Sequence, residues 1–369
     1  MTVGIVGAGQ LGRMLALAGY PLGLDFLFLD RTADAPAARI APALLGEFTD
    51  PRHLGELARR CRVISFDWEN ISVEALRAAT RGSGARIAPP LRALAAAQDR
   101  LAEKRLFERL GIPTTRHAAV DSPASLARAV TRIGLPGVLK TRRLGYDGKG
   151  QAVLRTSTDI ERAWTALGGA PLIYEEFVPF DYEVSALGAR STHGEVALYG
   201  LNRNVHVDGI LRLTRAPCGP PALERRAHAH LRHVLEAFGY AGVLAIEFFV
   251  RNGRLIANEM APRVHNSGHW TIEGAETSQF ENHLRAILGL PLGSTRARGH
   301  SAMINLIGAV PAARGLLAEP GLHLHDYGKA ARVGRKVGHC TIVAPTAAAR
   351  DARARKLLRR LYPGLGPIP

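Results

Sequence analysis

Cysteine is scarce in this chain, because Cys61, Cys218 and Cys340 are its only cysteines among 369 residues. An odd number at such wide spacing fits neither a disulfide framework nor a paired-cysteine zinc site, so we expect reduced thiols. The sequence also lacks a run of about 18 apolar residues, and residues 1–6 form a strand pattern without a basic leader. These absences favour a cytoplasmic protein with no membrane partner.

Lysine is also scarce, with six lysines against 42 arginines, although the formal net charge is +16. Such a charge attracts phosphate backbones, but the basic residues are spread over predicted helices and no basic run is interleaved with aromatics. We therefore expect a solvated arginine-rich surface and no nucleic-acid partner. Where this chain uses a lysine, a compact point charge is the expected reason. The six are Lys104, Lys140, Lys149, Lys329, Lys336 and Lys356.

The chain is long enough for two or three domains, and its 47% hydrophobic residues are typical of globular proteins. Short apolar strands alternate with helices over residues 1–95, which predicts a parallel sheet with crossover helices. The pattern next predicts a helical stretch over 91–110 and a capped helix from Asp121 to Gly134. Domain edges are expected near residues 95 and 291. This division gives an α/β domain (1–95), a central domain (96–290) and a C-terminal domain (291–369).

A carboxylate interrupts the apolar strand at 243–250, at Glu247. Burying an unpaired charge is too costly, so Glu247 must face a cation, a metal or a cleft. The turn at Asn252 sets the register of the hairpin: a three-residue turn puts Glu247 opposite Glu259, and a two-residue turn puts it opposite Asn258. Either register predicts an oxygen-rich cluster suited to Mg²⁺, whereas the alternative is a structural ion pair with an arginine.

A glycine-rich turn, Gly7-Ala8-Gly9-Gln10-Leu11-Gly12, follows the first strand, and Asp30 ends the next strand. This spacing matches the dinucleotide fingerprint and would indicate an NAD enzyme. The same glycines serve any turn that presents backbone N–H groups to a small anion. We favour a substrate phosphate or carboxylate over NAD.

Three further clusters indicate nucleotide chemistry. Glycines in the loop 145–151, with Lys149 inside it and Lys140 before it, predict a flap over a triphosphate rather than a plain hairpin. The segment 174–178 and Glu183 suit a nucleobase and its ribose, although a solvated strand end is the simpler interpretation. The basic segment 329–339 is either solvated charge or a clamp for a phosphate monoester. The absence of G-x-S-x-G argues against a hydrolase.

The order of these motifs resembles that of the 5-(carboxyamino)imidazole ribonucleotide synthase family, the PurK family of ATP-grasp carboxylases. The resemblance covers nearly the whole chain, and its most specific part is the segment 258–271. It runs through 7–14, Lys140, 145–151, 204–210, 258–271, 278–281, 303–308 and 334–339.

The resemblance implies a mixed α/β and α+β architecture: an ATP-grasp fold, a Rossmann-like N-terminal domain (pre-ATP-grasp), a flap-bearing subdomain at about 114–180 and a small β-rich C-terminal domain. It implies that ATP phosphorylates bicarbonate to carboxyphosphate, and that the carboxyl group moves to the amine of 5-aminoimidazole ribonucleotide in purine (IMP) biosynthesis. Mg²⁺, with Mn²⁺ as an alternative, and a homodimer are also expected.

Site residues are carried over by position. The residues expected to bind ATP are Arg100, Lys140, Gly145, Tyr146, Asp147, Gly148, Lys149, Gly150, Gln151, Glu175, Glu176, Phe177, Val178, Glu183, His206, Asn258 and Glu259. The expected metal ligands are Glu247 and Glu259. The residues expected to bind the ribonucleotide and bicarbonate are Gly9, Gln10, Leu11, Tyr146, Asp147, Arg212, Arg263, His265, Asn266, Ser267, Lys329 and Arg335.

Our hypothesis for catalysis gives roles to three of these residues. Arg263 steadies bicarbonate and the developing phosphate charge, while Asp147 or His265 accepts a proton from the amine. The alternatives are another ATP-grasp ligase, such as a formate-dependent glycinamide ribonucleotide transformylase, an NAD-linked oxidoreductase, and a nucleic-acid-binding protein. We disfavour all three.

Overall fold

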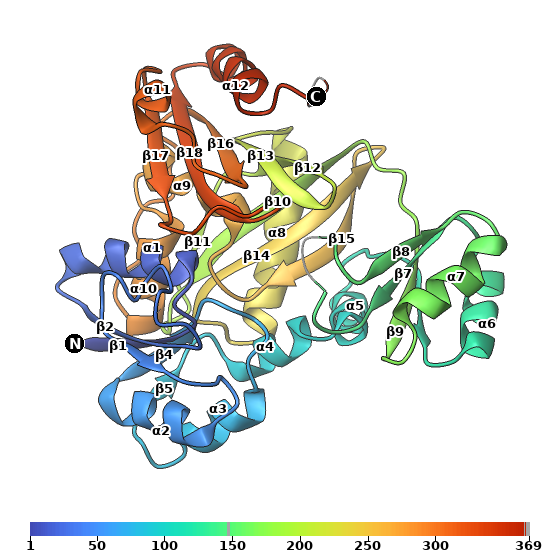
Figure 1. Cartoon of the computed structure of the whole chain (residues 1–369), viewed down its shortest axis with the longest axis horizontal. Helices are drawn as coiled ribbons and strands as arrows, with labels where there is room; N and C mark the ends of the chain where they lie inside the picture. Colours follow the sequence, from blue (N-terminus) through green and yellow to red (C-terminus); the bar gives the residue numbers. More distant parts are fainter. Residues whose placement is uncertain (146–147, 365, 367–369) are drawn as a thin grey trace.

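The computed structural model describes residues 1–145, 148–364 and 366. Its N-terminal part is a parallel five-stranded sheet in the order β3-β2-β1-β4-β5 (Figure 1). The strands are β1 (Thr2–Val6), β2 (Asp25–Asp30), β3 (Ala43–Leu45), β4 (Val63–Phe66) and β5 (Arg86–Ile87). The helices are α1 (Gln10–Gly19), η1 (Tyr20–Leu22), α2 (Pro51–Arg60) and α3 (Val73–Thr80). The predicted alternation of strands and helices is confirmed.

The predicted helical stretch over 91–110 is confirmed but divided into two helices, α4 (Leu91–Ala97) and α5 (Arg100–Arg109). Asp99 has extended backbone angles and accepts hydrogen bonds from the amides of Leu101 and Ala102, so it caps α5. The apolar pattern continues across this break and gave no sign of it. The break makes Arg100 the first residue of α5.

A separate lobe carries the glycine loop (Figure 1, right). Its four-stranded antiparallel sheet has the order β6-β9-β7-β8, with helices α6 (Pro123–Ile133) and α7 (Thr158–Leu167). The strands are β6 (His117–Val120), β7 (Gly137–Thr141), β8 (Gln151–Leu154) and β9 (Leu172–Glu176). The predicted start and stop of α6 are confirmed, because Ser122 and Ser125 form a capping box and Gly134 ends the helix.

The centre of the molecule is a nine-stranded antiparallel sheet, ordered β15-β14-β10-β12-β13-β16-β18-β17, with β11 paired to β10. Its strands are β10 (Tyr182–Arg190), β11 (Val196–Leu198), β12 (Asn202–Val207), β13 (Ile210–Ala216), β14 (Gly242–Arg251), β15 (Arg254–Ala261), β16 (His300–Ile307), β17 (Leu322–Asp326) and β18 (Lys336–Ala344). Strands after residue 291 thus extend the central sheet. The division into three domains at 95 and 291 stays a prediction.

Helices cover both faces of β14, and alternation along this strand decides which residue reaches the cleft. Leu244, Ile246 and Phe248 pack with α8 (Pro221–Ala237). Val243 and Ala245 belong to the cluster that contains α10 (Gln279–Leu288) and the N-terminal sheet. Glu247 follows Val243 and Ala245 on that second face.

The remaining elements are short or terminal: η2 (Asn266–Gly268), α9 (Thr271–Gly274), α11 (Ala313–Leu317) and α12 (Ala347–Leu361). All three cysteines are free thiols, as predicted. Within the described part of the chain, helices that combine the length and apolar character needed to span a membrane are absent.

Candidate active site

A cleft of about 950 Å³ lies where the N-terminal sheet, the glycine-loop lobe and the central sheet meet. Many residues predicted for the site line it, although they come from distant parts of the chain. These are Gly9, Gln10, Leu11, Arg100, Gly145, Lys149, Glu247, Glu259, Arg263, His265, Asn266, Lys329 and Arg335. The tertiary structure therefore brings the predicted triphosphate end and the predicted ribonucleotide end into one space.

The carboxylates of the hairpin are paired across β14 and β15, with Glu247 directly opposite Glu259. The turn itself has two residues, since Arg251 pairs with Arg254, and Asn252 and Gly253 both have positive φ. A two-residue turn alone would set Glu247 opposite Asn258, but a β-bulge between Glu247 and Phe248 shifts the register by one residue. The acid pair is confirmed, and the bulge is what produces it.

The paired carboxylates have opposite electrostatic surroundings. Burial raises the pKa of Glu247, and the nearby Glu259 raises it further, against the opposing effect of His206. Burial acts to raise the pKa of Glu259 too, but the Arg100 guanidinium, 3.0 Å from its carboxylate, holds that pKa below its usual value. A cation bound between them would favour the ionised form of both carboxylates.

Two of the scarce lysines are buried around one carboxylate, that of Glu175. Lys104 and Lys140 lie 3.3 and 3.2 Å from the same carboxylate oxygen of Glu175, and all three residues are buried. Burial works to raise the pKa of Glu175, but the two ammonium groups lower it strongly. Lys104 also donates to the backbone carbonyls of Ala257 and Asn258, and so ties α5 to β15. Lys149 is exposed and lines the cleft.

Some residues predicted to bind ATP are not among those that line the cleft. His206 contacts Glu183 at 2.8 Å, and Glu176 pairs with Arg116. The Asn258 carboxamide oxygen is buried without a hydrogen-bond partner. The members outside the lining are Lys140, Gly148, Gly150, Gln151, Glu175, Glu176, Phe177, Val178, Glu183, His206 and Asn258. Their roles stay predictions.

Arg263 and His265 lie beside the acid pair. The Arg263 guanidinium lies 3.2 Å from Glu69 and lines the cleft. Burial lowers the pKa of His265 well below its usual value. Its Nδ1 accepts the Ser267 amide hydrogen, so the ring proton lies on Nε2, 3.9 Å from Glu247. This tautomer turns the Nε2 hydrogen of His265 toward Glu247, and the assignment of the proton acceptor to Asp147 or His265 stays a prediction.

Tyr146 and Asp147 lie outside the described residues. The glycines around them have φ of 73° at Gly148 and 71° at Gly150, which L side chains rarely adopt. A Cβ on Gly150 would lie 2.6 Å from the Thr141 hydroxyl. These two positions therefore favour glycine, and the role of the loop as a flap stays a prediction.

The basic segment after β17 forms the other end of the cleft. Lys329, Arg332, Arg335 and Lys336 all line it, and Lys329 donates to the Gln10 side chain. Burial lowers the pKa of Lys329 to about 8, with Arg335 acting in the same direction. Ser267 is buried behind His265, and the Arg212 guanidinium lies 5.0 Å from the Tyr362 ring centroid, so both are outside the lining.

The glycine turn before α1 is partly filled by protein carboxylates. Asp30 accepts the Ala8 amide hydrogen at 2.7 Å, and Asp67 accepts that of Gly12 at 3.1 Å. In dinucleotide-binding proteins, pyrophosphate takes such amides and the acid after the second strand takes a ribose hydroxyl. Both positions are already used here, which argues against the NAD interpretation.

Sequence reasoning missed several acids and one lysine of this cleft. Asp67 and Glu69 follow β4 at the carboxyl edge of the parallel sheet, where ligands bind in such folds, and that position was the available signal. Glu103 and Lys104 gave no signal in the sequence, because they resemble ordinary charged helix residues. Burial raises the pKa of Glu103 to about 8, and Glu103 accepts the Met260 amide hydrogen.

The donor set at Glu247 and Glu259 fits magnesium. Mg²⁺ commonly takes one or two protein carboxylates and completes its shell with phosphate oxygens and water. A cluster of three or more His, Cys, Asp or Glu residues that could enclose a metal is absent from the described residues. The protein thus offers two carboxylates on one wall of the cleft, as expected for a metal shared with a bound triphosphate.

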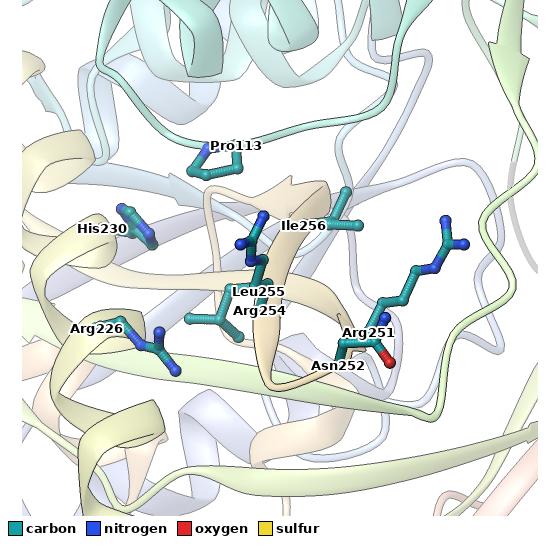
Figure 2. Close-up of a pocket in the computed structure, with 8 residues that line it drawn as sticks. All are labelled: Pro113, Arg226, His230, Arg251, Asn252, Arg254, Leu255 and Ile256. Carbon is teal, nitrogen blue, oxygen red and sulfur yellow. The ribbon is translucent and has the colours of Figure 1, made fainter.

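A second cavity of about 860 Å³ lies at the tip of the same hairpin (Figure 2). Figure 2 shows Arg226 and His230 on α8, opposite Arg254 on the hairpin, with Pro113 above them. Its lining contains none of the predicted site residues and no carboxylate. The candidate active site is therefore the acid-lined cleft.

The antiparallel sheet, the acid pair, the buried lysines and the glycine loop together define an ATP-grasp protein. Three family models match the chain in that order. They are the ribonucleotide synthetase preATP-grasp domain over residues 1–98, the ATP-grasp domain over 105–280 and the phosphoribosylaminoimidazole carboxylase C-terminal domain over 301–353.

Comparison with individual relatives identifies the family. The chain is 50% identical to N5-carboxyaminoimidazole ribonucleotide synthase of Pseudomonas aeruginosa, over 96% of this chain and 97% of the relative. Among solved structures, the Thermus thermophilus synthetase has a TM-score of 0.93 at 51% identity, covering 99% of this chain and 100% of that one. The Aspergillus clavatus synthase, in complex with ADP and 5-aminoimidazole ribonucleotide, has a TM-score of 0.90 at 32% identity, with 98% of each chain covered. The chain belongs to the N5-carboxyaminoimidazole ribonucleotide synthase family.

Proposed function

We propose that this protein carboxylates 5-aminoimidazole ribonucleotide with bicarbonate and ATP, giving 5-(carboxyamino)imidazole ribonucleotide in purine biosynthesis. The observation that carries the proposal is the arrangement of charge in one cleft. Carboxylates at Glu247 and Glu259 line the same space as the cations Lys329 and Arg335. An enzyme that uses a nucleoside triphosphate to modify a substrate with a phosphate monoester needs both the acidic and the basic groups. Family membership supports the same reaction.

The acid end accounts for activation of bicarbonate. Phosphoryl transfer depends on positioning and on cations around the transferred group, and needs no protein nucleophile. Arg100 and Lys140 supply fixed positive charge there, and Glu247 and Glu259 would hold Mg²⁺. When bound, the metal neutralises charge on the phosphate oxygens. Bicarbonate attacks the γ-phosphorus, its new P–O bond replaces the bond to ADP, and carboxyphosphate forms.

The basic end accounts for the second substrate. The N–H groups of Gln10 and Leu11, with Lys329 and Arg335, suit the phosphate of the ribonucleotide. The exocyclic amine then attacks the carboxyl carbon of carboxyphosphate, phosphate leaves, and the amine loses a proton. Arg263 lines the same cleft and steadies bicarbonate and the developing charge. Asp147 accepts the proton, and His265 orients Glu247.

Water must be kept away from carboxyphosphate, because hydrolysis would waste ATP. The glycine loop at 145–151 is the proposed lid, since Gly148 and Gly150 have backbone angles that other residues rarely adopt and the loop lies beside the acid end. A cytoplasmic homodimer stays a prediction, and light scattering on the purified protein tests the dimer.

The test is ADP formation with 5-aminoimidazole ribonucleotide and bicarbonate supplied together and separately, with formate in place of bicarbonate as the control. We expect the full rate only with both substrates, and a product that releases CO₂ on acidification. A full rate with formate, or without any ribonucleotide, would exclude the proposed reaction. Arg263→Ala should lower kcat, and normal turnover in this variant would remove the role given to Arg263.

A further inference from the structure

Asp67 has a role that the reaction outlined above does not assign. Its side chain is buried, with 7% of the residue exposed, yet it lines the cleft at the N-terminus of α1. One oxygen accepts the Gly12 amide hydrogen at 3.1 Å. Burial raises the pKa of the Asp67 carboxyl to about 6, and the amides of Gly12 and Gly9 act against that rise. The ten-residue helix α1 has no side-chain cap of its own. Asp67 reaches it from β4, 55 residues away in sequence.

The glycines of the turn leave the space that the Asp67 carboxylate occupies. A Cβ on Gly7 would lie 1.7 Å from one Asp67 oxygen, and a Cβ on Gly9 would lie 2.9 Å from the other. A Cβ on Gly12 would lie 3.2 Å from that second oxygen. The glycines of the turn thus make room for a protein carboxylate, at the place where a dinucleotide-binding protein binds pyrophosphate.

Occupation of these amides leaves a defined set of donors. The first N–H groups of a helix have no intrahelical partner. Asp67 accepts the amide hydrogen of Gly12 and lies against the amide of Gly9, and Asp30 accepts the amide hydrogen of Ala8. The amides of Gln10 and Leu11 have no hydrogen-bond partner among the described residues, and both residues line the cleft beside Lys329.

We propose that Asp67 is a positioning residue: it holds the turn before α1 so that two amides, those of Gln10 and Leu11, face the cleft and receive one phosphate monoester. The ribonucleotide substrate has a single phosphate, which this two-amide cradle fits. A diphosphate would need the amides that Asp67 occupies, and would meet its negative charge. This inference rests on the proposed function, because it names a residue behind the same substrate site.

The main test is steady-state kinetics of Asp67→Ala with each substrate varied in turn. We expect KM for 5-aminoimidazole ribonucleotide to rise about 30-fold, in line with the loss of hydrogen bonds to a charged group. KM for ATP and kcat should change less than about threefold, because the acid end is untouched. Asp67→Asn keeps an oxygen that can accept the same amides, and should restore most of the affinity.

Two further variants separate positioning from a purely structural role. Gly9→Ala tests the contact from the other side, because its backbone is compatible with alanine and its Cβ would meet only the Asp67 carboxylate. It should raise the same KM while the protein stays folded. Asp50→Ala removes a helix cap in the same sheet domain, and should lower the melting temperature without changing that KM.

The outcomes distinguish this inference from the proposed function. Unchanged KM for the ribonucleotide in both Asp67→Ala and Gly9→Ala would overturn the inference, and so would an equal rise in KM for ATP. Ribonucleotide-independent turnover by the wild type would overturn the proposed function instead. In that case calorimetry with ribose 5-phosphate still tests Asp67: binding by the wild type and its loss in Asp67→Ala supports the cradle, and equal binding by both refutes it.

Discussion

The two ends of the cleft carry opposite charge and are built from different kinds of element. The acid end lies on strands, with Glu247 and Glu259 paired across β14 and β15 in the middle of the molecule. The basic end lies on loops, with Lys329 and Arg335 between β17 and β18, and the glycine turn before α1. Strands fix the distance between two side chains, whereas loops allow backbone amides to approach a ligand.

The difference separates two kinds of task. Metal binding and phosphoryl transfer need rigid geometry, which a hydrogen-bonded ladder with a bulge provides. Recognition of a phosphate monoester needs donors that converge from several directions, which loop amides and long cationic side chains provide. Variants at the two ends should therefore differ in their kinetics. Substitutions at the acid end should lower kcat, and substitutions at the basic end should raise KM for the ribonucleotide.

The largest effect is expected at the acid pair. Glu259→Gln and Glu247→Gln should each lower kcat roughly 10³-fold, because charge on the transferred phosphoryl group loses its stabilisation. Titration of ADP formation with Mg²⁺ should show a raised requirement in both variants. Glu276→Gln is the control, since Glu276 pairs with Arg296 outside the cleft. Near-normal turnover in either acid variant would contradict the assignment of phosphoryl transfer to the acid end.

The basic end should respond in KM. Lys329→Ala should raise KM for 5-aminoimidazole ribonucleotide about 100-fold, because a charge-assisted contact to phosphate is lost. KM for ATP should stay within about twofold. The matched control is Lys356→Ala, which removes a lysine paired with Glu319 on the surface. A parallel rise in KM for ATP would mean that the two ends do not act separately.

The glycine loop should respond mainly through ATP. Gly150→Ala introduces both an unfavourable φ and a Cβ 2.6 Å from the Thr141 hydroxyl, so we expect KM for ATP to rise about 10-fold. Gly23→Ala is matched for φ, at 68°, but its Cβ would meet nothing within 4 Å. It should leave both KM values unchanged. Equal effects of the two substitutions would point to general backbone strain.

The smallest effect is expected from pH. Lys329 binds phosphate only as a cation, and burial lowers its pKa to about 8. Below this pKa the cation is present, and above it the cation is lost, so KM for the ribonucleotide should rise roughly fourfold between pH 7 and pH 8.5. KM for ATP should not follow this profile. Lys329→Arg should abolish the rise, because arginine keeps its charge over this range.

Local sequence patterns predicted much of the fold and the site. Alternating apolar strands and helices gave the parallel sheet, and the single acid in an apolar strand pointed to Glu247. The scarcity of lysine pointed to Lys140 and Lys329, because each lysine in an arginine-rich chain needs a reason. These signals are local. Because burying a charge is costly, a charged residue in an apolar segment indicates a site.

Other features had no local signal. The helix break at Asp99 was missed, since the apolar pattern continues across it. Strands β12 and β13 were missed, because their alternation is filled with polar residues such as Asn204 and Arg212. The turn between Asn252 and Gly253 was readable, but the bulge that shifts the register was not. Bulges depend on how a strand meets its neighbours, and that information lies elsewhere in the chain.

The sequence by itself determined which chemical groups this protein contains and where the chain turns. The cost of burying charge, helix capping and the backbone angles of glycine all depend on a few neighbouring residues. Only the tertiary structure decided which groups meet. It placed Glu247 opposite Glu259 through a bulge, and it brought Lys104 and Lys140 to one carboxylate of Glu175. It also filled a dinucleotide-like turn with Asp67, since contacts between residues far apart in the chain depend on how sheets and lobes pack together.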